Sequence, residues 1–257
     1  VLNTDNMSIL GLTIDYGPYG FLDAFDPFWT PNLTDASGKR YAYRNQPEIG
    51  QFNLVMLANA LIAGDVLLKE EAEAALEHYS LALLAEYNAR MAAKVGLQQY
   101  DKAVATELLK LMYEDDGDFT LTFRALSAIP SQPAPGAPEG ALPPALRAAI
   151  RKPLTAEREA VWAQWVAAYQ ARLRQDGVPD AQRAAAQDAA NPKFIPRQHL
   201  LQWAIEAAEA GDYSELDTLL DLVTRPYEEH PGADPKYTAA PPEHMVRPGV
   251  CMLSCSS

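Results

Sequence analysis

The N-terminal segment, residues 1–18, constrains what this chain can fold into more than any other stretch. Within it, apolar residues alternate with polar ones over positions 7–14 around Gly11, which predicts two short strands joined by a glycine turn. Folding such a hairpin would bring its two ends together, so Asn6 before it and Asp15 after it would face one point. The pattern therefore predicts a short N-terminal β-hairpin with a polar site at its open end.

The residue types at that site suit a divalent cation. Asn6 and Asp15 offer oxygen ligands, which Mg²⁺ prefers, and Mg²⁺ takes few protein carboxylates when it also holds substrate phosphates. Asp5, next to Asn6, offers a carboxylate that could accept a proton as a general base, or could simply bind its own backbone in a turn. We take Asp5 as the candidate catalytic residue and Asn6 and Asp15 as the candidate metal ligands.

Composition and charge limit the classes of partner. The chain has 257 residues, 48% of them apolar, which is enough for a packed core in one large or two small domains. Its formal charge of −13 argues against a nucleic-acid or membrane partner, because both require clustered Lys and Arg. No apolar run reaches the roughly 18 residues of a membrane span, and the first residues do not have the pattern of a signal peptide. The two cysteines, Cys251 and Cys255, both lie near the C-terminus and cannot form a disulfide framework for the core. This fits a reducing compartment, so we expect a cytoplasmic protein.

Hydrophobic periodicity beyond Asn45 predicts a mainly α-helical chain. One helix is expected to begin near Pro47, and the others are expected at about 69–94, 100–113, 119–129, from Thr155 onward, 180–190, 198–210 and 214–224.

Caps and apolar faces follow from the same periodicity. Asp118 and Thr155 are expected to be N-caps, and Ser214 with Asp217 is expected to form a capping box. Three apolar faces are predicted: Ile49, Phe52, Met56 and Ala60 in the first helix; Trp162, Trp165, Val166, Tyr169 and Leu173 in the helix after Thr155; and Leu216, Leu219, Leu220 and Val223 in the last helix.

Two stretches do not have helical periodicity. Residues 19–45 are rich in aromatic and turn-forming residues and predict an ordered irregular loop. Residues 130–144 are rich in Pro and Ala and predict a surface loop or flexible linker. We therefore expect a core domain over residues 1–129, a Pro/Ala-rich loop over 130–150 and a helical extension with a cysteine-containing tail over 151–257.

Several common catalytic patterns are missing from the sequence. The four histidines have no zinc-ligand spacing and are expected at the surface or satisfied in the core: His78, His199, His230 and His244. There is no G-x-S-x-G motif of a serine hydrolase and no glycine-rich phosphate-binding motif. Any phosphate-gripping loop is therefore expected outside these residues.

Five blocks of sequence, spread from one end of the chain to the other, resemble the selenoprotein O family. They lie at residues 1–18, 40–47, 191–194, 207–214 and 254–257. The resemblance implies a kinase-like fold that moves AMP from ATP onto Ser, Thr or Tyr hydroxyls of other proteins and releases pyrophosphate. It implies that this chain is the C-terminal lobe, that a nucleotide-gripping N-terminal lobe is its partner, and that the chain alone is inactive.

The resemblance also implies roles for single residues. Asp5 would be the base, Asn6 a metal ligand, and Asp15 a ligand that binds ATP phosphates through Mg²⁺ or Mn²⁺. Residues 19–45 would be the activation segment, against which a protein substrate lies. Cys255 stands where some members carry selenocysteine, which suggests a redox role for the tail, the alternative being two ordinary thiols on a frayed terminus. Bacterial members would be cytoplasmic, and eukaryotic ones mitochondrial.

Two features depart from the pattern of ordinary protein kinases. Asp15 is followed by Tyr16 where kinases have Phe, and Asp5 adjoins Asn6 directly, whereas kinases separate their catalytic Asp and Asn. Both departures argue against transfer of the γ-phosphate. Two alternatives remain open from the sequence, a kinase-like phosphotransferase and a non-catalytic helical binding scaffold.

Overall fold

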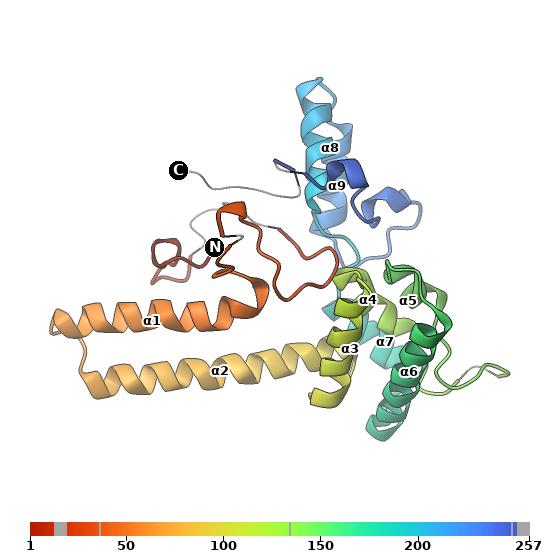
Figure 1. Ribbon diagram of the computed structural model, residues 1–257, viewed down its shortest axis with the longest axis horizontal. Coiled ribbons are helices and arrows are strands. Elements are labelled where there is room, and N and C mark those ends of the chain that lie inside the picture. The colour runs from red at the N-terminus through yellow and green to blue at the C-terminus, as the bar shows by residue number, and fades with distance from the viewer. Residues whose placement is uncertain (13–19, 36, 134, 248, 251–257) are drawn as a thin grey trace. The chain divides into compact units, whose positions relative to one another are not determined.

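The computed structural model describes residues 1–12, 20–35, 37–133, 135–247 and 249–250, and its regular elements are helices (Figure 1). Strand pairing among these residues is limited to two isolated bridges, Ala24 with Asp118 and Gly117 with Ile150. The prediction of a mainly α-helical chain is confirmed. The N-terminal hairpin is not confirmed, because residues 7–12 contain a turn and no strand and most of the second arm lies outside the described residues. The kinase-like lobe stays a prediction.

The described residues form α-helices and 3-10 helices in the following order. The α-helices are α1 Gln46–Ala63, α2 Lys69–Val95, α3 Lys102–Glu114, α4 Phe119–Ala125, α5 Pro144–Ala149, α6 Ala156–Asp176, α7 Asp180–Ala190, α8 Gln198–Glu209 and α9 Ser214–Thr224. The 3-10 helices are η1 Thr4–Asn6, η2 Leu33–Asp35, η3 Tyr43–Asn45, η4 Leu126–Ala128, η5 Pro235–Tyr237 and η6 Glu243–Met245.

The chain divides into two compact units. Unit 1 contains the described residues of Val1–Gly20, Pro27–Tyr87 and His244–Ser257. Unit 2 contains Phe21–Asp26 and the described residues of Asn88–Glu243. The boundary between the two units falls within helix α2, between Tyr87 and Asn88.

In unit 1, α1 and the first part of α2 form an antiparallel helical hairpin (Figure 1). The hydroxyl of Tyr79 on α2 donates to the carbonyl of Pro47 on α1 at 3.0 Å. A Cβ added at Gly50 would lie only 2.6 Å from that hydroxyl oxygen, so a larger residue at this position would displace the Tyr79 hydroxyl.

The buried face of α1 differs from the predicted one. Phe52 and Met56 are 41% and 39% exposed, while the buried positions are Ile49, Gly50 and Asn53. The prediction was wrong because apolar periodicity gives weight only to apolar side chains. Here the helix buries a polar side chain, Asn53, which binds backbone and sulfur atoms of the N-terminal segment.

Unit 2 has the larger aromatic core. The predicted stripe on α6 is confirmed, because Trp162, Trp165, Val166, Tyr169 and Leu173 are all buried. Each large aromatic residue of the stripe also finds a polar partner, as buried Trp and Tyr usually do. The indole of Trp162 donates to Asp115 at 2.8 Å, and the hydroxyl of Tyr169 donates to the Val95 carbonyl at 2.6 Å.

The predicted N-caps in unit 2 are also confirmed. The Thr155 side chain accepts from the backbone N–H of Arg158, and Asp118 accepts from that of Leu121. The capping box at Ser214 was wrong, because Ser214 is already inside α9 and its N–H is bound instead by Asp212 at 2.9 Å.

Helices α8 and α9 pack against each other around a small apolar cluster of Phe194, Leu200, Ala204, Leu219, Leu222 and Tyr237. The predicted face of α9 was partly wrong. Leu219 is buried and Val223 is partly buried, but Leu216 and Leu220 are 43% and 56% exposed, and Leu222 is buried in their place. Leucines occupy both sides of α9, so the sequence alone could not assign its inner side.

The Pro/Ala-rich stretch is fastened to unit 2. The backbone N–H of Ser131 donates to Asp180 at the start of α7, and that of Gly140 donates to Gln170 of α6, both at 3.0 Å. Helix α5 lies near the end of the predicted 130–150 loop. These contacts favour an ordered surface loop over a flexible linker.

Candidate active site

The candidate base and one candidate metal ligand lie on η1, in unit 1. Both Asp5 and Asn6 are exposed. The Asn6 backbone N–H donates to the Asn3 carbonyl, and its side-chain amide donates to the Val1 carbonyl, both at 3.0 Å. The second bond fixes the amide nitrogen and leaves the amide oxygen of Asn6 without a partner among the described residues.

Two side chains from outside the segment hold residues 1–7, which we call the catalytic loop after the role predicted for Asp5. The buried Asn53 amide donates to the Leu2 carbonyl and contacts the Met7 sulfur, both at 2.9 Å. The Tyr41 hydroxyl donates to the Asn3 side-chain oxygen at 3.0 Å. The loop is thus held at both ends and in the middle, while the Asp5 carboxylate makes no hydrogen bond to another described residue.

Asp15 lies outside the described residues. Its predicted convergence with Asn6 is therefore untested, and it stays a prediction. Among the described residues there is no cluster of three or more His, Cys, Asp or Glu side chains that could hold a metal ion. The described residues offer a metal ion two oxygen donors. These are the exposed carboxylate of Asp5 and the neighbouring amide oxygen of Asn6, to which no other described group binds.

The segment that supplies Tyr41 is itself organised around Asp35. The Asp35 carboxylate accepts from the backbone N–H groups of Arg40 and Tyr41 at 2.8 and 2.7 Å. The amide of Gln46 donates to the Tyr41 carbonyl at 2.6 Å. The described residues of 32–46 therefore form an ordered irregular segment, in agreement with this part of the irregular loop predicted over 19–45, and they present Tyr41 to the catalytic loop.

Two hollows adjoin the catalytic loop. One, of about 490 Å³, is mostly apolar and lies between the loop and α1, lined by Thr4, Met7, Ser8, Ile9, Gly11, Asn53, Leu54, Met56 and Leu57. The other, of about 270 Å³, is lined by Val1, Gly20, Trp29, Pro31, Tyr41, Tyr43 and Gln46. The site thus has an apolar side and an aromatic side.

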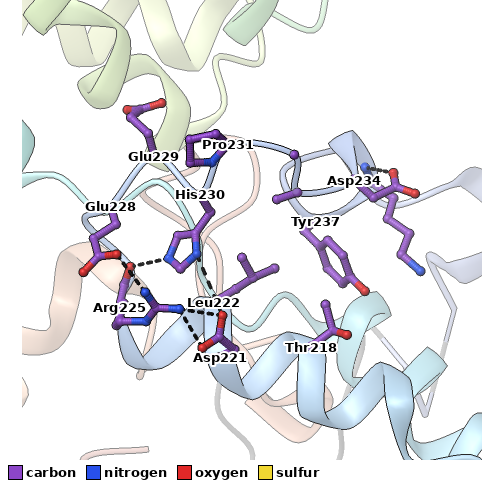
Figure 2. A pocket seen from close by; sticks show the side chains of 13 residues that line it. Thr218, Asp221, Leu222, Arg225, Glu228, Glu229, His230, Pro231, Asp234 and Tyr237 are labelled. Carbon is purple, nitrogen blue, oxygen red and sulfur yellow. Dashed lines mark hydrogen bonds and ion pairs between the residues drawn. The ribbon is translucent and has the colours of Figure 1, made fainter.

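A third hollow, of about 600 Å³ and larger than these two, lies in unit 2 between α9 and the segment that follows it (Figure 2). Its charged groups bind each other. Arg225 donates to both Asp221 oxygens at 2.7 Å and to Glu228 at 3.0 Å, and the ring of His230 contacts the Arg225 carbonyl at 3.0 Å. A ligand would have to break these pairs, so this hollow is a weaker candidate site despite its size.

Sequence reasoning missed three residues that hold the site. Asn53 and Tyr41 act on groups far from them in sequence, at separations of 51 residues for Asn53 with Leu2 and 38 for Tyr41 with Asn3. Asp35 binds backbone N–H groups of Arg40 and Tyr41, only five and six residues away. One signal was available for Asn53, because it follows the buried Ile49 by one helical turn and so stands on the inner face of α1.

The remaining predictions about single residues have mixed outcomes. His199 was expected at the surface or satisfied in the core, but it is buried and neither ring nitrogen has a hydrogen-bond partner among the described residues. The exclusion of water lowers the pKa of its imidazole to about 4. Cys251 and Cys255 lie outside the described residues, so the redox hypothesis stays untested. In the part of the chain that the structure describes, no helix has the length and apolarity needed to traverse a bilayer.

Comparison with known sequences gives the class of the chain. Residues 1–224 match the family model described as protein adenylyltransferase SelO. The match includes the catalytic loop, both loop-holding side chains and most of unit 2. The chain belongs to this family.

Individual relatives agree with that assignment. The chain is 41% identical over 263 residues to the protein nucleotidyltransferase YdiU of Aromatoleum aromaticum, covering all of this chain and 48% of the relative. It is 41% identical over 276 residues to the protein of the same name from Rhodopirellula baltica, and 43% identical over 262 residues to that of Azoarcus sp., covering 50% and 49% of those proteins. The chain spans about half the length of the curated relatives that it matches.

Proposed function

We propose that this chain carries the catalytic loop of a protein adenylyltransferase. The enzyme would work in the cytoplasm and move AMP from ATP onto Ser, Thr or Tyr hydroxyls of other proteins. The single observation that carries the proposal is the family match over residues 1–224, which contains an exposed Asp5 and Asn6 on a loop fastened from two sides.

In this proposal Asp5 is the general base. Its exposed carboxylate takes the proton of the acceptor hydroxyl while the hydroxyl oxygen forms a bond to the α-phosphorus of ATP. The bond from that phosphorus to the bridging oxygen breaks, and pyrophosphate leaves with the electron pair. A base held in position contributes roughly 10²- to 10⁴-fold to the rate. An exposed carboxylate with no other described partner is available for this work.

Asn6 and Asp15 would hold Mg²⁺ or Mn²⁺. The bound ion would neutralise charge on the phosphate chain as pyrophosphate departs. On the protein side, the bond from the Asn6 amide nitrogen to the Val1 carbonyl turns its oxygen outward, and no described group competes for it. Asp15 would supply the second oxygen ligand from the far end of a hairpin.

The fold proposed for the whole protein is kinase-like. This chain would be its C-terminal lobe, and an N-terminal lobe would hold the ATP phosphates. The ordered segment around Asp35 would be the activation segment, since it lies against the catalytic loop through Tyr41 and Asn3. Its partners would be proteins that carry an acceptor hydroxyl.

The proposal is tested with protein expressed from its complete coding sequence and given ATP labelled on the α-phosphate, with Mg²⁺ or Mn²⁺. We expect label in acceptor protein and release of pyrophosphate, and we expect Asp15→Ala to abolish both. Retained transfer in Asp15→Ala, with unchanged dependence on the metal concentration, would contradict the assigned site.

The same reaction separates the two alternatives. Label that reaches protein only from the γ-phosphate would identify a phosphotransferase. Calorimetry that detects no metal-dependent ATP binding would identify a non-catalytic scaffold. Either result would reject the proposed transfer of AMP.

A further inference from the structure

The aromatic hollow beside the catalytic loop has an unusual electrostatic setting. Three exposed cations, Lys39, Arg40 and Arg44, lie within two residues in sequence of Tyr41 or Tyr43, which line the hollow. None of them forms an ion pair with another described residue, although the chain has 34 acidic residues and a net charge of −13. Cations left unpaired in so acidic a chain form a local site for an anionic group.

These cations lie over aromatic rings. The Arg44 guanidinium carbon is 4.1 Å from the centre of the Phe28 ring, and that of Arg40 is 4.8 Å from the Phe52 ring. Lys39 lies 5.8 Å from the same Phe28 ring. An Arg stacked on a ring is held by its flat face, while the N–H groups at its edge stay available for a carboxylate.

The hollow itself suits one side chain better than a free small molecule. Its volume of about 270 Å³ is below the roughly 300–1,000 Å³ of common small-molecule pockets. Its walls include Trp29, Pro31, Tyr41 and Tyr43, and Trp, Tyr and Arg are the residues most enriched at the centres of protein interfaces.

The hollow also has a direct connection to the candidate base. Tyr41 lines it and donates through its hydroxyl to Asn3, the residue that precedes η1, on which Asp5 lies. Val1, at the start of the catalytic loop, lines it as well. A chain seated in the hollow would therefore pass beside the catalytic loop.

We propose that Trp29, Tyr41, Tyr43 and the cations Lys39, Arg40 and Arg44 form a docking surface for the acceptor protein, here called the aromatic-basic surface. It takes an acidic segment that places one apolar side chain in the hollow and presents its hydroxyl to Asp5. This inference rests on the proposed function, because it assigns the acceptor that Asp5 deprotonates.

The test uses protein from the complete coding sequence and three short synthetic peptides, each with one serine. One flanks the serine with Glu and a Phe, the second replaces each Glu with Lys, and the third replaces the Phe with Gly. We expect KM for the acidic Phe peptide to be at least about tenfold below that for the basic one, with the Gly peptide between them, because like charges across an interface repel.

Charge reversal gives the decisive comparison. Arg40→Glu with Arg44→Glu should raise KM for the acidic peptide about tenfold or more, lower it for the basic one, and leave KM for ATP unchanged. The matched control is Lys102→Glu with Lys110→Glu, two exposed cations of α3, which should change none of these values. Arg40→Gln with Arg44→Gln keeps the test usable if the reversed variant fails to fold, and should raise KM for the acidic peptide by a smaller factor.

The outcomes separate this inference from the function on which it rests. Peptide binding measured by fluorescence anisotropy needs no transfer, so selective binding without labelling would leave the surface intact and reject the adenylyltransferase. Transfer with equal KM for all peptides, unchanged by charge reversal, would reject the surface and leave the function. A change in KM for ATP alone would assign the cations to the nucleotide and reject the surface.

Discussion

The catalytic loop of unit 1 and the core of unit 2 use polar groups in opposite ways. The catalytic loop is held by neutral hydrogen bonds from Asn53 and Tyr41, and the carboxylate of Asp5 stays exposed and unpaired among the described residues. In unit 2 the Arg197 side chain is 1% exposed and pairs with both Asp23 and Asp118. The catalytic loop therefore has an exposed, unpaired carboxylate among the described residues, whereas the core of unit 2 pairs its buried charges with each other.

This difference teaches where function and stability reside. A charge that is already paired and buried in the protein cannot take part in chemistry without breaking that pair, at a cost of several kcal/mol. An exposed carboxylate on a loop that neutral groups hold in place reacts without that cost. Substitutions in the catalytic loop should therefore change activity with little effect on stability, and those in the core of unit 2 should do the reverse.

The largest expected effect is that of Asp5→Asn. It should lower the rate of AMP transfer by about 10²- to 10⁴-fold, because the amide cannot accept the hydroxyl proton. The melting temperature should stay unchanged, since the carboxylate has no described partner to lose. Initial rates of labelling and thermal unfolding are measured on the same preparation. Asp65→Asn, at an exposed aspartate in the turn between α1 and α2, is the matched control and should keep full activity. A rate within about twofold of wild type for Asp5→Asn would end the assignment of the base.

The second-largest effect is expected on stability, in the core of unit 2. Among the described residues, Arg197→Leu leaves the buried Asp118 with Arg151 as its one charged partner, and it should lower the free energy of unfolding by about 3–5 kcal/mol. Arg225→Leu is the control, because Arg225 also pairs with two acids but is 48% exposed, and its loss should leave the free energy of unfolding almost unchanged. Urea unfolding at neutral pH gives both values. Equal costs for the two arginines would show that burial does not separate these networks.

The sequence predicted most helices because their information is local. Apolar spacing over a few turns indicated α6 and its buried face, and single side chains such as Thr155 and Asp118 marked helix starts. It could not predict that Arg197 would pair with Asp23, which is 174 residues away. Burial of a cation depends on which distant acid the fold brings to it, and no local pattern records that.

The candidate site shows the same limit. Asp5 and Asn6 could be picked out because two adjacent oxygen-bearing residues before a predicted turn are visible in sequence. Tyr41 could not be picked out, because a phenol in an irregular segment is ordinary until the fold brings Asn3 to it. Spacing could place Asn53 on the inner face of α1, but it could not predict the contact with Leu2. The candidate residues could be read from the sequence, and the contacts that hold their loop could not.

The third effect is a pH dependence confined to unit 2. Burial holds the pKa of His199 at about 4, and the charged groups acting on it are Asp23, Arg197 and Arg151. The unfolded chain takes up the proton below about pH 6.5, while the folded protein does not do so until about pH 4. Stability should therefore be lost as pH falls through that window, by roughly 2–3 kcal/mol at most.

Unfolding curves at several pH values, compared between wild type and His199→Leu, isolate this contribution from that of the carboxyl groups. The variant should lose less stability between about pH 6.5 and pH 4 than wild type does. His78→Leu, at an exposed position of α2, should follow wild type. Parallel curves for wild type and His199→Leu would show that the buried imidazole does not set the acid sensitivity.

The smallest effect is expected in unit 1, at Asn53, the residue of α1 that binds the catalytic loop. Asn53→Ala removes the donor to the Leu2 carbonyl and the contact with the Met7 sulfur, a loss of about 1–2 kcal/mol. Because those atoms lie on either side of Asp5 and Asn6, loosening them should lower kcat by about 5- to 30-fold and weaken the response to metal, with a small change in melting temperature. Asn53→Gln keeps the donor and should recover part of kcat, whereas Asn59→Ala, at an exposed position of the same helix, should match wild type. If kcat falls only in proportion to the unfolded fraction, and the metal response is unchanged, then Asn53 supports the fold of unit 1 and does not position the catalytic loop.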